Sequence, residues 1–170
     1  MNRLVSSTPA YSSLDIDYRF FRLYEHDFAE ARETLKMMGR YRRHDVLFAL
    51  LRDAVVAYAR PFSVNKKPTK GRHELPLRFV PRVRRSLHRE LIALRMTMFA
   101  HTDFIARSPR VTLWDNGEPP RPILSFSNPP YEAWLRRRSE VASLVAEMEG
   151  AVKDEIARIE ETALWRPVAT

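Results

Sequence analysis

The sequence predicts an all-α fold: a four-helix-type bundle with an irregular loop or small β-hairpin inserted before the last long helix. Three observations lead to this prediction. Apolar residues recur at intervals of three and four over most of the chain. Glycine or proline marks several expected helix boundaries: Gly39 and Pro61 follow helix ends, and Pro81 precedes a helix start. Only the insertion, at about 105–130, alternates as a hairpin would, around the turn signal Asp115-Asn116-Gly117.

The first part of the chain is expected to hold a tail and two helices. Residues 1–13 are rich in Ser, Thr and Pro and predict a flexible tail, which leaves 14–170 as one domain. A helix is expected over Tyr24–Met38, with its apolar stripe on one face. The next, from about Arg42 to Ala59, is apolar nearly all round, which is typical of a helix at the centre of a bundle.

The second part should hold a loop and two more helices. The polar segment 62–80 predicts a long, mobile loop, and Pro81 suits the start of a third helix that runs to about Thr102. The last helix should begin after Asn128-Pro129-Pro130 and continue for about thirty residues. The expected core positions of these two helices are Val83, Leu87, Leu91, Leu94 and Met98, then Val141, Val145, Met148, Val152, Ile156, Ile159 and Ala163.

Composition excludes several kinds of site. The chain has no cysteine, its four glycines are too dispersed for a phosphate-binding loop, and its five histidines stand alone. We therefore expect no metal and no cofactor. The absence of an apolar leader or span predicts a cytoplasmic protein with no membrane partner. The net charge of +8 favours an anionic partner such as nucleic acid, although arginine bias in a GC-rich genome would give the same charge.

The candidate catalytic residues are Arg95 and His101, at the end of the third predicted helix. Arginine binds phosphate, and histidine is the side chain that titrates nearest neutrality. On a regular helix their side chains would point about 120° apart, so a shared site needs the helix to unwind near Ala100 or a second subunit. The alternative is a core histidine bonded to a carbonyl and an arginine paired with a carboxylate.

Two arginine-bearing segments are candidates for phosphate binding. Tyr58 and Arg60 could join Arg95 in one pocket, or Arg60 could merely favour the negative end of its helix while Tyr58 seals the bundle. The second segment is a stripe at positions i, i+3 and i+7, which consists of Arg82, Arg85 and Arg89. Such a stripe suits contacts with a nucleic-acid backbone, or it is a solvated face.

The Arg95…His101 pair, with the string from Tyr58 to Phe62, resembles the HEPN superfamily of small helical bundles. Many members are metal-independent ribonucleases that act as homodimers and leave 2′,3′-cyclic phosphate ends, often in toxin–antitoxin systems. The resemblance implies that His101 transfers a proton, that Arg95 stabilises charge on the phosphate, and that Tyr58, Arg60 and Asp103 support them. It also implies RNA and a cognate antitoxin as partners.

One residue departs from the pattern of active members. The arginine is commonly followed by a polar residue, whereas Met96 stands there in this chain. Two functional hypotheses therefore stay open, besides a purely structural role. The chain is a dimeric ribonuclease, or it is a non-catalytic bundle that binds nucleic acid or a protein through its arginine-rich faces.

Overall fold

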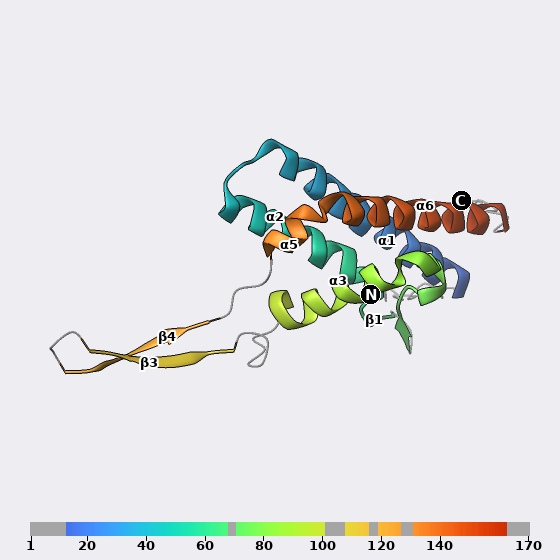
Figure 1. Ribbon diagram of the computed structural model, residues 1–170. Helices are drawn as coiled ribbons and strands as arrows, with labels where there is room; N and C mark the ends of the chain where they lie inside the picture. The colour runs from blue at the N-terminus through green and yellow to red at the C-terminus, as the bar shows by residue number, and fades with distance from the viewer. Residues whose placement is uncertain (1–12, 68–70, 101–107, 116–118, 127–130, 163–170) are drawn as a thin grey trace, which may run out of the picture.

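The computed structural model describes residues 13–67, 71–100, 108–115, 119–126 and 131–162. It confirms the predicted fold class, a mostly helical bundle with a small β-hairpin before the last long helix (Figure 1). The main helices are α1 (Ser13–Met37), α2 (His44–Ala59), α3 (Arg85–Leu94) and α6 (Arg138–Thr162). Helix α1 packs along both α6 and α2. Among the described residues, none of the helices combines the length and the apolar character needed to cross a membrane.

The first helix begins much earlier than predicted, at Ser13 instead of Tyr24. Its apolar stripe continues towards the N-terminus through Ile16, Phe20 and Phe21, which are buried against the rest of the bundle. This burial stabilises the additional turns, which the sequence pattern left unassigned. Of the predicted tail, only Ser13 lies within the described residues, and it belongs to the helix.

The second helix is central only in its second half. Leu51, Val55 and Tyr58 are fully buried, but Val46, near the start of α2, is only partly covered. Helix α2 ends at Ala59, and Pro61 lies in the short 3₁₀ turn that follows, η2 (Arg60–Phe62).

The described parts of the segment 62–80, residues 62–67 and 71–80, contain regular structure and buried residues where the polar composition predicts a long, mobile loop. Strands β1 (Asn65–Lys66) and β2 (Arg72–His73) pair antiparallel, and a 3₁₀ turn, η3 (Leu77–Phe79), follows. Leu75 and Val80 are buried in the core, and the Leu75 amide donates a 2.7 Å hydrogen bond to the carbonyl of Pro61. These contacts fix the segment against the bundle.

The third helix changes its geometry twice. It starts with a 3₁₀ turn, η4 (Arg82–Arg84), continues as α3, and ends in a π-helical segment, η5 (Arg95–Ala100). Leu87, Leu91 and Leu94 are buried as predicted. Val83 is 88% exposed, so its place in the predicted core stripe is wrong. A 3₁₀ turn has three residues per turn, which shifts Val83 out of the phase of the helix that follows.

The last predicted helix is interrupted. Helix α5 (Tyr131–Arg136) is separated by Arg137 from α6, whose six predicted core positions from Val141 to Ile159 are all buried. Ala163 lies outside the described residues. The inserted hairpin consists of β3 (Arg110–Trp114) and β4 (Arg121–Ser125), and it extends away from the bundle (Figure 1).

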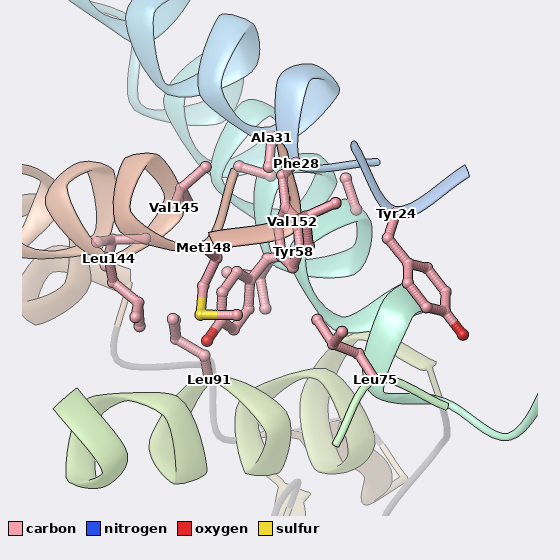
Figure 2. Close-up of a cluster of buried hydrophobic side chains, with 14 of the residues drawn as sticks. Tyr24, Phe28, Ala31, Tyr58, Leu75, Leu91, Leu144, Val145, Met148 and Val152 are labelled. Atoms are coloured by element: carbon pink, nitrogen blue, oxygen red, sulfur yellow. The ribbon is translucent and has the colours of Figure 1, made fainter. Parts of the chain in front are cut away.

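The core is filled by large side chains from all four main helices. Figure 2 shows Phe28 from α1, Tyr58 from α2, Leu91 from α3 and Met148 from α6 converging on one another. One carboxylate, Glu149, is also buried there. It is neutralised by two cations that reach in from the surface, Arg32 at 3.3 Å and Lys153 at 2.6 Å.

Candidate nucleic-acid interface

Arg95 stands where α3 changes into the π-helical segment η5. Its side chain is half-buried, and Nη1 lies 2.8 Å from the Sδ atom of Met96. A thioether is a weak acceptor and carries no charge. No described residue forms an ion pair with Arg95, so the predicted carboxylate partner is not found in that part of the chain. The guanidinium retains its capacity to bind an anion.

The π-helical geometry of Arg95–Ala100 changes the expected relation between Arg95 and His101. In a π-helix the hydrogen bonds run from residue i to i+5, so the 120° separation calculated for a regular α-helix does not hold over this segment. Such segments are uncommon and frequently occur at functional sites. His101 and Asp103 themselves lie outside the described residues.

A pocket of about 220 Å³ opens beside Arg95. Two segments line this pocket. The third helix contributes Ile92, Arg95 and Met96, and the end of α2 with the residues after it contributes Ala59 and residues 62–64. The end of α2 and the residues that follow it therefore lie next to Arg95. The pocket combines apolar walls with one arginine, which suits a ligand that has an apolar part and a negative charge.

The two predicted supporting residues of that segment have other contacts. Arg60 binds two carboxylates of α1, Asp27 at 3.2 Å and Glu30 at 2.5 Å. Burial raises the pKa of the Asp27 carboxyl, and the Arg60 guanidinium counteracts that rise. Tyr58 is fully buried, and its hydroxyl lies 2.9 Å from Nδ1 of His88. Neither Tyr58 nor Arg60 lines the pocket beside Arg95.

The predicted stripe on the third helix, which we name the α3 arginine face, consists of Arg82, Arg85 and Arg89. Arg82 and Arg89 are exposed, and Arg85 is half-buried. None of the three forms an ion pair with a described residue, and the buried Nε of Arg85 has no hydrogen-bond partner there. These three arginines therefore hold positive charge that the described part of the fold does not neutralise.

Two neighbouring arginines behave differently. Arg84 binds Glu147 with Nε and Nη2, at 3.0 and 2.7 Å, and Arg137 binds Glu90 at 2.6 Å. Surface arginines in this region thus find carboxylates where the fold supplies them. Arg136 and Arg138, on either side of Arg137, also form no ion pair with a described residue, so binding of an external anion and a solvated face both stay open for the α3 arginine face.

The α3 arginine face leads into the pocket beside Arg95. Spacings of four, three and four residues place four side chains along one side of the helix: Arg85, Arg89, Ile92 and Met96. The first two carry the charge, and the last two line the pocket. Together, the stripe and the pocket form a continuous candidate surface for a polyanion.

The sequence did not reveal a second polar cluster at the other end of the bundle. The Tyr24 hydroxyl lies 2.5 Å from Nδ1 of His73, whose Nε2 lies 3.3 Å from Asp17. Burial lowers the pKa of His73 and raises the pKa of Tyr24. The adjoining pocket, about 230 Å³, is lined by carboxylates and arginines of opposing charge, including the pair Glu155 and Arg158. Because side chains of both charges line this pocket, it favours neither an anionic nor a cationic ligand. We therefore consider this pocket a weaker candidate site.

Within the described residues, no three histidine, cysteine or acidic side chains come together as metal ligands would. No known protein family, no curated protein and no solved structure matches the chain.

Proposed function

We propose that the chain binds RNA along the α3 arginine face and cleaves it without a metal ion, using Arg95 and His101. One observation supports this most strongly. Arg85 and Arg89, which have no carboxylate partner among the described residues, lead along α3 to a pocket lined by Arg95, and Arg82 precedes them in the 3₁₀ turn η4. Arginine forms paired hydrogen bonds with phosphate oxygens, and a row of such cations follows the spacing of a nucleic-acid backbone.

The cleavage step rests on the resemblance to HEPN ribonucleases. The RNA 2′-hydroxyl attacks the adjacent phosphorus while His101 assists the transfer of its proton. The bond from phosphorus to the 5′-oxygen breaks, which leaves a 2′,3′-cyclic phosphate and a free 5′-hydroxyl. Arg95 stabilises the negative charge that develops on the phosphate oxygens. Asp103, two residues after His101, is assigned a supporting role.

A second candidate function is binding without cleavage, to RNA or to a protein such as an antitoxin. Met96 favours it, because an apolar side chain takes the position that is commonly polar in active HEPN members. Met96 is 44% exposed, and its sulfur accepts a hydrogen bond from the Arg95 guanidinium. The arginine face would serve this function unchanged.

A matched pair of variants tests the binding surface. Arg89→Ala removes an unpaired charge, whereas Arg84→Ala removes one that Glu147 already neutralises. Affinity for single-stranded RNA is measured against salt concentration. Arg89→Ala is expected to lower the slope by about 0.7, the value for one phosphate contact on a single strand, and Arg84→Ala by much less. Equal effects of both variants, or no salt-dependent binding by the wild type, would contradict the proposed surface.

A further inference from the structure

We infer that the hairpin β3–β4 is a dimerisation arm, whose apolar face packs against the same face of a second copy of the chain. This inference goes beyond the proposed function, because it concerns a part of the molecule outside the arginine face and is tested without RNA. It assigns a role to the insertion that interrupts the helical bundle, and it commits to one occupant of the exposed face.

The strand register divides the hairpin into two unlike faces. Val111 pairs with Leu124, and Leu113 pairs with Pro122. Side chains of opposed residues share a face, and successive residues alternate between faces, so these four apolar side chains lie together. We name them the apolar arm face. The other face carries Arg110, Thr112 and Trp114 from β3 and Arg121, Ile123 and Ser125 from β4.

The apolar arm face is uncovered in the single chain. Val111 and Leu113 are each 69% exposed, Leu124 is 52% exposed, and Phe126 just beyond β4 is 57% exposed. Figure 1 shows the hairpin extending away from the bundle, so the described helices do not shield it. A two-stranded hairpin with both faces in water is marginally stable at best. A contiguous exposed apolar patch marks an interaction site in a folded protein.

The area of this face matches what a second copy requires. At roughly 100 Å² for each of the four side chains and for Phe126, complete burial of one arm would remove at most about 500 Å² from water. Two arms packed on each other would bury at most about 1,000 Å² together, which reaches the lower limit for a specific protein interface. A second arm supplies an equal apolar area at the same spacing. The contact is self-complementary, as a two-fold dimer requires.

The distribution of charge also selects this face for self-association. Each chain carries a net charge of +8, so two copies repel unless their contact avoids the basic side chains. The apolar arm face has no charged residue, and Arg110 and Arg121 lie on the opposite face. Two hairpins packed with their apolar faces inward would lie about 10 Å apart and keep these arginines in water.

Sedimentation equilibrium of the full chain without RNA tests the inference. The wild type is expected to be a dimer at micromolar concentrations. The double variant Leu113→Lys with Leu124→Lys places charge on the apolar arm face and should be a monomer. Its matched control, Thr112→Lys with Ser125→Lys, adds the same charge to the opposite face of the same strands and should remain a dimer. A monomeric wild type, or dimers in both variants, would overturn the inference.

Cross-linking keeps the test decisive if the lysine variant fails to form its hairpin. The chain has no cysteine, so a single introduced cysteine is the only reactive thiol. A short bismaleimide is expected to link two copies of Leu124→Cys, and not of Ile123→Cys on the opposite face. Equal cross-linking of both variants would contradict the packing. Because RNA is absent from both experiments, a negative result here leaves the test of the arginine face unaffected.

Discussion

The hydroxyl of Tyr58 lies 2.9 Å from Nδ1 of His88, in the interior of the bundle between α2 and α3. The ring of Phe62 packs on the same imidazole, with centroids 4.4 Å apart. Phe62 also lines the pocket beside Arg95, and His88 lies next to Arg89 of the α3 arginine face. The Tyr58–His88 contact therefore holds the two sides of the candidate site together.

Removing the Tyr58 hydroxyl should destabilise the protein. Tyr58→Phe leaves Nδ1 of His88 buried without its partner, which costs about 1–3 kcal/mol in the free energy of unfolding. Urea denaturation at neutral pH measures this loss. Tyr41→Phe is the control, because Tyr41 is 43% exposed and its hydroxyl can be hydrated. Equal stability of Tyr58→Phe and the wild type would show that the hydrogen bond contributes nothing.

Acid should destabilise the fold through His88. Burial lowers the pKa of His88 from its ordinary 6.5, so the unfolded chain binds more protons than the folded one as the pH falls through that value. The free energy of unfolding is therefore expected to be highest above about pH 6.5 and to decrease below it. His73, whose pKa burial also lowers, adds to the same trend.

The variant His88→Gln isolates the contribution of His88, because glutamine keeps a polar side chain near Tyr58 but does not titrate. Its free energy of unfolding should change less between pH 8 and pH 5.5 than that of the wild type. The remaining change would come largely from His73. An unaltered pH dependence in His88→Gln would exclude His88 as a source of the acid sensitivity.

Arg60 should matter for stability and not for RNA binding. Arg60→Ala leaves Asp27 half-buried without its cation, and because solvent screens the exposed Arg60 guanidinium, the expected loss is about 1 kcal/mol at neutral pH. The pKa of Asp27, already raised by burial, should rise further in the variant. Protonation at lower pH then removes the unpaired charge, so the deficit should shrink as the pH falls. A loss of RNA affinity as large as that of Arg89→Ala would instead place Arg60 in the binding surface.

The two cations at Glu149 should compensate for each other. The Glu149 side chain is 6% exposed, and removing its cations leaves a buried, unpaired carboxylate. The combined variant Arg32→Ala with Lys153→Ala is expected to lose about 3 kcal/mol, more than the sum of the two single variants. Denaturation of all four proteins gives this coupling. Additive losses would mean that each cation acts alone.

The periodicity of apolar residues was sufficient to predict the buried positions of helices that have a strong amphipathic pattern. In α6, every described core position that the sequence predicted, from Val141 to Ile159, is buried, because burial of one stripe decides the phase of a long helix. The pattern failed at Val83, because no residue type marks the change from a 3₁₀ turn to an α-helix. It failed again at Leu75, where a buried residue sits in a polar segment that is held by a long-range hydrogen bond.

The candidate site was predictable in its residue types but not in its pairings. Arg60 and Arg89 look alike in the sequence, yet two carboxylates of α1 neutralise Arg60 and no described residue neutralises Arg89. That difference depends on which helices come together in space. The same holds for Tyr58 and His88, which are thirty residues apart in the chain. The π-helical geometry that begins at Arg95 also has no signature in the sequence.

The central claim is that Arg95 and His101 cleave RNA without a metal ion. The most direct measurement incubates the wild type, Arg95→Ala and His101→Ala with single-stranded and structured RNA in EDTA, and identifies the ends of the products. Each variant is first shown to unfold like the wild type. The account predicts 2′,3′-cyclic phosphate ends for the wild type and loss of cleavage in both variants. Cleavage that persists in both, or a folded wild type that binds RNA but cleaves none of it, would contradict the claim.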